Sequence, residues 1–280
     1  MAIKRVGIAG CGVMGRGLAQ TLARYGLDTV VVDVSRDILD QGREEIHQGL
    51  RFYCFRNKEF DPEAAMDRIR FDTSPGAFSD VDFLVENITE KPELKEPLYR
   101  ELDRVCQPDC VFAANTSAIS ITRIASWTGR PDRVIGMHFM NPVPMKPVVE
   151  VIRGWHTSDE TVAVAEVFLA ILEKKAVVVK DMPGFVSNRV LMLMVNEAVW
   201  LIQDGVAGPK EVDEIFRSCF GHTMGPLETA DLIGLDTILY SLDVLYESYR
   251  DSKFRPCPLL KKMVDAGLYG MKTGEGFHVY

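Results

Sequence analysis

Residues 5–15 read RVGIAGCGVMG, and this stretch decides the fold of the first part of the chain. The apolar run from Ile3 to Ala9 predicts a short buried strand. A helical pattern follows from Val13 onward, and Gly26 ends it. The order is therefore strand, glycine-rich turn, helix, which is the first part of a βαβ unit.

Three glycines in this turn, Gly10, Gly12 and Gly15, have the spacing GxGxxG. The first glycine permits a tight turn, the second lets a pyrophosphate approach the backbone, and the third lets the helix pack on the strand. The pyrophosphate of a dinucleotide is expected at the helix N-terminus, beside Val13 and Met14. The motif in this context predicts a dinucleotide site.

An acidic residue stands where the second strand ends. The run Thr29 to Val32 predicts that strand, and Asp33 follows it, 23 residues after Gly10. A carboxylate there accepts hydrogen bonds from ribose hydroxyls and repels a 2′-phosphate, so NAD is expected rather than NADP. Arg36 leaves NADP open, because a guanidinium three residues on is able to reach a 2′-phosphate.

Strand-like and helix-like runs alternate over much of the chain. This alternation indicates a doubly wound, mostly parallel sheet. Further strands are expected at 81–86, 111–114, 134–138 and 176–179, and helices at 93–104 and 160–172. Residues 38–69 interrupt the pattern with amphipathic, helix-like sequence that carries Arg51, Arg56 and Lys58; a surface helical hairpin and a substrate-contacting element are both open.

Length and composition are those of a globular protein. At 280 residues the chain has room for about two domains of about 150 residues, and 47% of its residues are hydrophobic. The formal net charge of −8 gives no attraction to a phosphate backbone, so no nucleic-acid partner is predicted.

No targeting or membrane signal is recognised in the sequence. The start has no signal-peptide core and no apolar run approaches about 18 residues, so a cytoplasmic protein without a membrane partner is expected. The six cysteines form no CxxC pair, so reduced thiols and no metal site are predicted.

A break occurs at Asp181-Met182-Pro183-Gly184, beyond which the strand-like alternation disappears. We expect one domain over residues 1–182 and another over 183–280. The stretch Val186 to Leu201 predicts a helix whose core, Val190 to Val195, is apolar on every face. Such a helix must be covered on all sides, so a homodimer formed through the second domain is predicted.

Polar residues follow several of the expected strands at their carboxyl ends, where open α/β sheets bind ligands. Ser117 comes after the strand 111–114, and His138 closes the strand 134–138. A dehydrogenase needs a base for the hydroxyl proton, and imidazole titrates near working pH. Glu150 stands in an apolar run and needs a partner, which a histidine would supply.

Seven motifs together resemble the 3-hydroxyacyl-CoA dehydrogenase family over essentially the whole chain. They are VGIAGCGVMG, NTSAISIT, HFMNPVP, VVEVI, DMPGFVSNRV, MGPLETADLIGLD and KTGEGF. The resemblance implies an α/β protein with a Rossmann-type doubly wound sheet, followed by an all-helical C-terminal dimerisation domain. It also implies oxidation of a 3-hydroxyacyl thioester to the 3-oxoacyl thioester with NAD.

The resemblance also implies roles for single residues. His138 matches the family's catalytic base and Glu150 the acid that orients it, while Ser117 and Asn188 match the residues that contact the substrate. Asn141 matches a supporting asparagine. Positions near the riboses or nicotinamide of the cofactor are matched by Asp33, Glu90, Lys95 and Asn115. By residue type alone, Glu90 and Lys95 fit a solvated face.

Three departures from the family pattern leave the substrate carrier open. Met140 stands where a second aromatic is usual after the histidine, and Ala118 where a second serine is usual. The helix after Asn188 is unusually rich in methionine, at Met192 and Met194. Together with Cys219-Phe220-Gly221-His222, this pattern is similar to that of dehydrogenases that act on acyl groups tethered to an acyl carrier protein, including the glyceryl type of polyketide pathways. CoA and a carrier protein therefore both remain as carriers.

Two rival functions are also open. A non-catalytic NAD-binding protein has the same fold, because fold does not prove activity. The joint presence of Ser117, His138, Glu150 and Asn188 argues against it. A hydroxyacid dehydrogenase with a lysine base has no support, since the base position is the histidine of HFMNP.

Overall fold

The computed structural model of the chain describes residues 3–280, which divide into two compact units. The first unit ends at Asp181, and the second runs from Met182 to Tyr280. The sequence-based division lies after residue 182. No helix within residues 3–280 is both long and apolar enough to cross a membrane.

An eight-stranded sheet of order β3-β2-β1-β4-β5-β6-β7-β8 forms the centre of the first unit. Neighbouring strands are parallel except for β6 and β7, which are antiparallel. The predicted doubly wound, mostly parallel sheet is therefore confirmed. The strands are β1 (Arg5–Ala9), β2 (Asp28–Val32), β3 (Ile69–Asp72), β4 (Phe83–Glu86), β5 (Val111–Ala114), β6 (Val134–His138), β7 (Val148–Arg153) and β8 (Lys175–Lys180).

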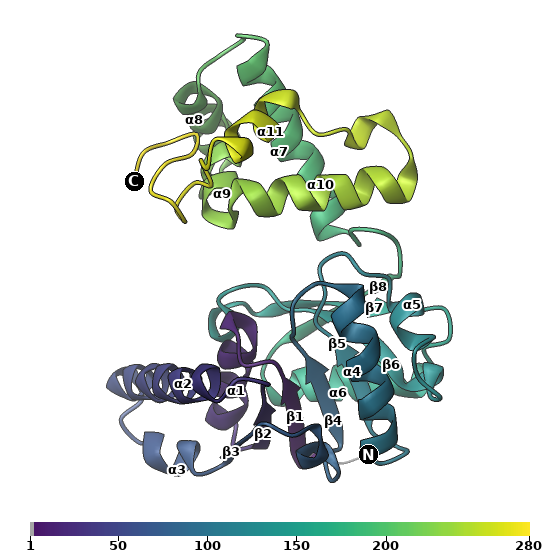
Figure 1. Ribbon diagram of the computed structural model, residues 1–280. Coiled ribbons are helices and arrows are strands. Elements are labelled where there is room, and N and C mark those ends of the chain that lie inside the picture. Colours follow the sequence, from purple (N-terminus) through teal and green to yellow (C-terminus); the bar gives the residue numbers. More distant parts are fainter. Residues whose placement is uncertain (1–2) are drawn as a thin grey trace. The chain divides into compact units, whose positions relative to one another are not determined.

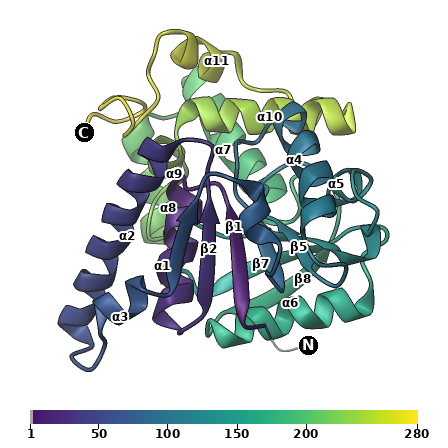
Figure 2. The same cartoon turned by 60° about the horizontal axis from the view of Figure 1, so that its bottom comes forward.

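Helices cover both faces of this sheet (Figures 1 and 2). One core joins the strands to α1, α2 and α6, and within it Phe83 stacks on Phe168 with ring centroids 4.3 Å apart. On the other face, Tyr99 of α4 contacts Phe112 of β5. The helices are α1 (Val13–Arg24), α2 (Arg36–Arg56), α3 (Pro62–Met66), α4 (Pro92–Val105), α5 (Ile121–Ala125) and α6 (Asp159–Ile171), with 3-10 turns η1 (Pro75–Phe78), η2 (Pro131–Arg133) and η3 (Val143–Met145).

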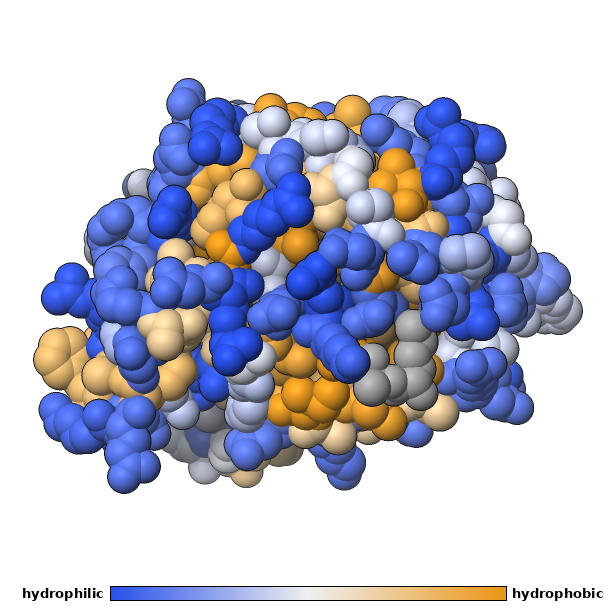
Figure 3. Space-filling model, turned by 90° about the horizontal axis from the view of Figure 1, so that it is seen from below, coloured by the Kyte–Doolittle hydropathy of each residue, from blue (hydrophilic) through white to orange (hydrophobic). Residues whose placement is uncertain are grey.

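The helix-like insertion of residues 38–69 is a helical hairpin followed by a strand. Ser35 caps α2 through a hydrogen bond that its Oγ accepts from the Ile38 amide, and Asp61 caps α3 in the same way. Leu39, Ile46 and other apolar side chains of α2 are buried against the first unit. The outer surface drawn in Figure 3 is mainly hydrophilic, with smaller hydrophobic areas between polar side chains.

The second unit is helical, as predicted. Its helices are α7 (Ser187–Gln203), α8 (Pro209–Phe220), α9 (Pro226–Ile233), α10 (Leu235–Tyr249) and α11 (Pro258–Asp265), with the 3-10 turn η4 (Ser252–Phe254). Met192, Val195 and Val199 of α7 lie in the core of this unit. Between Met182 and Tyr280, strand pairing is limited to isolated bridges near the C-terminus.

Two buried aspartates fasten the C-terminal residues to the second unit. Asp231 accepts hydrogen bonds from the amides of Phe277 and His278, at 3.0 and 2.9 Å, and from the Tyr280 hydroxyl at 3.2 Å. Asp213 of α8 accepts from the amide of Leu227 and lies 2.7 Å from Nε2 of His278. Burial, together with the charge of Asp231, raises the pKa of Tyr280 well above its ordinary value. The tail is therefore held to the second unit by hydrogen bonds, although Val279 and Tyr280 remain exposed.

Candidate active site

The carboxyl ends of β1, β2, β4, β5 and β6 bring most of the predicted site residues to one edge of the sheet. The glycine turn follows β1, Asp33 follows β2 and Asn115 follows β5, while His138 is the last residue of β6. Because the strands are parallel, these ends lie side by side at one edge of the sheet. Open α/β sheets bind their ligands at this edge. Asn188 belongs to the second unit, in the first turn of α7.

The glycine turn has the space that a dinucleotide requires. Gly12 is the N-cap of α1, and a Cβ atom placed on it would meet nothing within 4 Å. A Cβ on Gly15 would lie 1.9 Å from the carbonyl oxygen of Gly10, so only glycine fits there. The first amides of α1, those of Val13 and Met14, have no carbonyl partner within a helix and are suited to phosphate oxygens. The turn therefore fits the pyrophosphate of NAD.

The backbone of the glycine turn holds the Asp33 carboxylate in place. Its Oδ2 accepts a hydrogen bond from the Cys11 amide at 2.8 Å, and its Oδ1 accepts from the Ser35 amide at 3.2 Å. A carboxylate has about four acceptor positions, so capacity remains for ribose hydroxyls. Arg36 lies 3.6 Å from Asp40 on the exposed side of α2. Burial, followed by the charge of Asp33, raises the pKa of the Cys11 thiol to about 11.

His138 and Glu150 face each other across the one antiparallel pair of strands. The last residue of β6 is in register with the third residue of β7, and His138 Nδ1 lies 3.1 Å from Glu150 Oε2. Both side chains are buried, with 6% and 7% of their residue surfaces exposed. If Nδ1 donates its hydrogen to the carboxylate, Nε2 is left as the basic nitrogen. The reversal of β7 therefore builds the arrangement of a base with an orienting acid.

Ser117 lies on the other side of the imidazole. Its Oγ is 3.1 Å from His138 Nε2. The turn that carries it is fixed by Glu90, whose Oε1 accepts hydrogen bonds from the amides of Ser117 and Ala118, at 2.9 and 3.2 Å, and from the Thr116 hydroxyl. Glu90 thus holds the backbone that presents Ser117 to the histidine.

Asn115 connects the ends of three neighbouring strands. Its Nδ2 donates to Asn87 Oδ1 at 2.7 Å, just beyond β4, and its Oδ1 accepts from the Phe139 amide at 3.2 Å, just beyond β6. Asn87 was not predicted from the sequence. Its position directly after a strand that ends at Glu86 is the signal that points to it.

Lys95 does not lie on a solvated face, which corrects the expectation from residue type alone. It has no exposed surface, and its Nζ lies 2.7 Å from both carboxylate oxygens of Glu86, which is equally buried. Its Nζ is also 3.4 Å from Glu90 Oε2. The sequence around each residue does not predict this ion pair. Glu86 ends an apolar strand, and Lys95 lies in a helix rich in charged residues.

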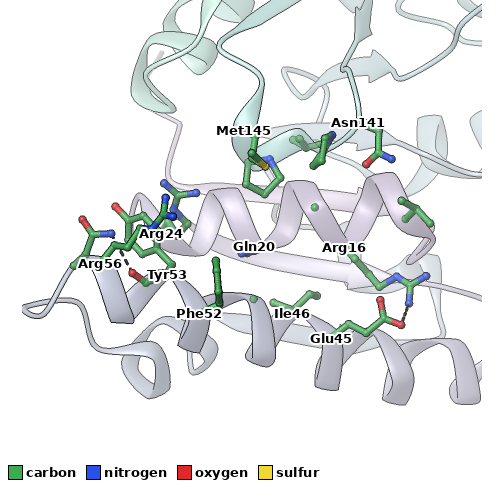
Figure 4. A pocket seen from close by; sticks show the side chains of 17 residues that line it. Arg16, Gln20, Arg24, Glu45, Ile46, Phe52, Tyr53, Arg56, Asn141 and Met145 are labelled. Carbon is green, nitrogen blue, oxygen red and sulfur yellow. Dashed lines mark hydrogen bonds and ion pairs between the residues drawn. The ribbon is translucent and has the colours of Figure 1, made fainter. Parts of the chain in front are cut away.

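A cavity of about 480 Å³ runs between α1, α2 and η3 (Figure 4). Arg24, Tyr53 and Arg56 gather at one end of it, and Asn141 lies toward the other (Figure 4). The guanidinium of Arg24 stacks 3.8 Å from the Tyr53 ring centroid. Lining residues are Val13, Arg16, Gly17, Gln20, Arg24, Glu45, Ile46, Gly49, Phe52, Tyr53, Arg56, Asn57, Asn141, Pro142, Val143, Pro144 and Met145. The cavity therefore joins the loop after His138 to a cationic, aromatic end.

The three basic residues singled out in the insertion do not act as one group. Arg56 lines this cavity, whereas Arg51 and Lys58 line a separate, smaller hollow on α2. Sequence reasoning missed the contribution of α1, from Arg16, Gln20 and Arg24. Their spacing of four residues, which places them on one side of a helix, is the signal that reveals it. Within residues 3–280, no cluster of three or more His, Cys, Asp or Glu side chains is arranged to hold a metal ion.

Comparisons with known proteins cover both units. The family model described as the 3-hydroxyacyl-CoA dehydrogenase NAD binding domain matches residues 5–182, and that of the C-terminal domain matches residues 184–280. A probable 3-hydroxybutyryl-CoA dehydrogenase of Deinococcus radiodurans is 46% identical over 277 residues, which cover 99% of this chain and 100% of the relative. A 3-hydroxybutyryl-CoA dehydrogenase of Bradyrhizobium diazoefficiens is 44% identical over 281 residues, covering 99% and 96%.

Solved structures are similar over the same length. The crystal structure of an (S)-3-hydroxybutyryl-CoA dehydrogenase from Ralstonia eutropha superposes with a TM-score of 0.96 at 43% identity and covers 100% of this chain and 99% of its own. A 3-hydroxybutyryl-CoA dehydrogenase from Escherichia coli has a TM-score of 0.95 at 32% identity, with 100% of this chain and 60% of that chain covered.

Proposed function

Because the chain belongs to the 3-hydroxyacyl-CoA dehydrogenase family, we propose that it oxidises the 3-hydroxyl group of a CoA-linked 3-hydroxyacyl thioester to the 3-oxo group with NAD, reversibly. The observation that carries the proposal is the placement of His138 between Glu150 and Ser117, at the same edge of the sheet as a glycine turn that fits a dinucleotide. NAD supplies the acceptor for the hydride that leaves C3. The turn from Gly10 to Gly15 and Asp33 are the residues proposed to hold it.

In the proposed reaction, His138 is the general base. Its Nε2 removes the proton of the 3-hydroxyl group as the hydride leaves. Glu150 fixes the tautomer with the hydrogen on Nδ1 and stabilises the imidazolium that forms. Ser117 Oγ, 3.1 Å from the same Nε2, donates a hydrogen bond to the reacting oxygen. Asn188 is proposed as a second neutral donor near the thioester.

Replacing the two members of this pair tests the proposal. His138→Gln is expected to abolish turnover of 3-hydroxybutyryl-CoA while NAD still binds, and Glu150→Gln to do nearly the same. Loss of one positioned base typically costs about 10² to 10⁴ in rate, so a change of a few-fold is not support. Steady-state kinetics and NAD titration calorimetry measure both quantities.

The exposed residue His156 offers the matched control, and His156→Gln should leave kcat unchanged. A near-normal kcat in either pair variant removes the pair assignment. Wild-type protein that binds NAD but turns over no 3-hydroxyacyl thioester supports the non-catalytic reading instead.

CoA is proposed as the carrier because of the cavity beside α1. Arg24 and Arg56 offer cations for the phosphates of the nucleotide, and Tyr53 offers a ring beside them. Asn141 at the other end follows shortly after His138, so a pantetheine arm has a path from one end to the other. An acidic carrier protein needs a basic patch spread over surface helices, whereas Arg51 and Lys58 line a different hollow from Arg56.

Two thioesters with the same acyl group distinguish the carriers. Arg56→Ala is expected to raise KM for 3-hydroxybutyryl-CoA roughly tenfold or more and to leave KM for the pantetheine thioester unchanged, since only CoA carries the nucleotide phosphates. Arg51→Ala, on the same helix, is the control and should change neither KM. A higher kcat/KM for the same acyl group on an acyl carrier protein than on CoA overturns the CoA assignment and favours the carrier-protein, polyketide-type alternative.

A homodimer formed through the second unit is also proposed. Its helices carry large apolar side chains at the surface, among them Ile215 and Phe220 of α8, which are 51% and 67% exposed. Exposed apolar side chains of this size favour association. Light scattering that finds a monomer at micromolar concentration contradicts the dimer.

A further inference from the structure

A buried cluster of charged and polar side chains lies near the turn that carries Ser117 and has no part in the proposed chemistry. It consists of Glu86 at the end of β4 and of Lys95 and Tyr99 on α4, none of which has any exposed surface. Glu86 accepts from Lys95 Nζ at 2.7 Å through both oxygens, from the Ile88 amide at 2.7 Å and from the Tyr99 hydroxyl at 3.2 Å. The carboxylate is thus surrounded by donors.

Such a pair is costly to bury. Burial raises the pKa of Glu86 above its ordinary value, and the charge of Lys95 offsets only part of this rise. The attraction between two buried ions often only offsets their loss of hydration, so apolar residues of equal volume are frequently as stable. Stability alone therefore does not account for an ion pair at this place.

The pair is connected to the active site through Glu90. Lys95 Nζ lies 3.4 Å from Glu90 Oε2, while the other oxygen of Glu90 accepts the amides of Ser117 and Ala118. One carboxylate therefore bridges a buried cation and the turn that carries Ser117. The position of the cation fixes the direction in which Glu90 points.

We infer that Glu86 is a positioning residue for the dehydrogenase reaction, which acts through Lys95 and Glu90 on Ser117. Glu86 holds the Lys95 ammonium, the ammonium orients Glu90, and Glu90 sets the turn that presents the Ser117 hydroxyl to His138 Nε2. The inference rests on the proposed roles of Ser117 and His138. A displacement of about 1 Å at a reacting group can cost about 10²-fold in rate. The orientation of the Ser117 hydroxyl is therefore expected to affect kcat.

Glu86→Gln tests the inference, because it keeps the size of the side chain and removes its charge. The Lys95 ammonium then has Glu90 as its remaining carboxylate, which draws Glu90 away from the turn. We expect kcat at saturating NAD to fall by about 10-fold to 100-fold, with a smaller change in KM for the acyl thioester. Tyr99→Phe removes one hydrogen bond from the same carboxylate and is the control, with kcat expected within about threefold of wild type.

A double-mutant cycle with Ser117→Ala separates positioning from a general loss of structure. If Glu86 acts through Ser117, Glu86→Gln lowers kcat by less than about twofold in the Ser117→Ala background. A full loss that persists in that background overturns the inference, and so does a kcat of Glu86→Gln within about threefold of wild type. If Glu86→Gln does not fold, Glu86→Gln with Lys95→Met removes both charges and enters the same cycle with the same criteria.

A signal that needs no substrate keeps this test separate from the proposed function. In protein labelled with ¹⁵N-histidine, the Nε2 resonance of His138, assigned with His138→Gln, reports its hydrogen bond with Ser117. We expect it to move in Glu86→Gln as it does in Ser117→Ala, and to stay in Tyr99→Phe. An unmoved resonance in Glu86→Gln overturns the inference, whereas absent turnover in wild-type protein overturns only the proposed function.

Discussion

Two glycines of the cofactor turn have opposite surroundings. A side chain on Gly12 enters open space, whereas one on Gly15 collides with the Gly10 carbonyl. Gly12→Ala is therefore expected to keep the thermal stability of the protein and to lose NAD affinity, because its methyl group occupies the place of the pyrophosphate. Gly15→Ala is expected to lower the free energy of unfolding by about 1 to 3 kcal/mol. Calorimetry measures the stability and NAD titration the affinity. Equal losses of stability in Gly12→Ala and Gly15→Ala contradict the different roles assigned to the two glycines.

The thiol next to these glycines is expected to be unreactive. The pKa of Cys11 is about 11, so at pH 8 about one molecule in a thousand carries the thiolate, which is the reactive form. Because the pKa is raised, the thiolate fraction grows about tenfold per pH unit up to that value. Iodoacetamide with peptide mass spectrometry should label the exposed Cys219 at pH 8 and leave Cys11 unmodified. Rapid labelling of Cys11 in folded protein contradicts this account.

At the residue scale, the sequence was informative where position along a strand decides the outcome. Ser117 follows an apolar run, His138 ends one and Glu150 stands within a third, so their proximity was predictable, and the resemblance to a family indicated their roles. The burial of Lys95 was not predictable, because it depends on Glu86 across the strand-helix junction. The spacing of Arg16, Gln20 and Arg24 places them on one side of α1, but that they line a cavity depends on α2 lying beside them, which the sequence does not show.

At the scale of elements, a strand was predictable from the sequence where it consists of a continuous run of apolar residues. The interior strands β1, β2, β4, β5 and β6 are apolar runs and were placed to within two residues of their observed ends, whereas β7 was recognised only as an apolar run around Glu150 and not as a strand. Strand β3 was missed, because Arg70 and Asp72 make it a polar edge strand that resembles a loop. Helix α2 was expected only as amphipathic, helix-like sequence, and its buried residues do recur every three or four positions along one face of the helix.

Asp231 of α9 makes most of the hydrogen bonds that hold the C-terminal tail, beside the contact of His278 with Asp213. Asp231 accepts two backbone amides and one hydroxyl from residues 277–280. Asp231→Asn replaces an acceptor with a donor against those amides and is expected to lower the free energy of unfolding by about 2 to 3 kcal/mol. Urea unfolding followed by circular dichroism gives the value. The exposed Asp265→Asn, at the end of α11, is the control, and a loss as large there removes the special role of Asp231.

At the scale of the whole molecule, each unit has a hydrophobic core of its own. Two unfolding transitions are therefore expected in calorimetry. NAD at about 100 times its Kd stabilises the unit that binds it by about 2.7 kcal/mol, so the transition of the first unit should rise by roughly 5 to 10 °C and the other should stay. A single transition that moves as a whole contradicts independent units.

The sequence indicated where the two units divide but not how they are arranged. The break at Asp181 to Gly184 is visible because strand-like runs end there. Asp181 itself is fixed to the first unit, where its Oδ2 accepts from the Ser120 and Thr122 hydroxyls at 2.8 and 2.6 Å. No linear pattern of residues contains that contact, because it joins positions about 60 apart in the chain.

The reversal of β7 also has a consequence for how activity is regained after denaturation. His138 and Glu150 meet only when β6 and β7 pair in the observed register, and a slip of one residue turns Glu150 to the opposite face of the sheet. With the roles proposed for His138 and Glu150, a refolding chain with all its helices and most of its strands formed is expected to stay inactive until this pairing is correct. Turnover is expected to recover later than the far-ultraviolet circular dichroism signal during refolding. The delay then reports when β7 pairs with β6 in the correct register.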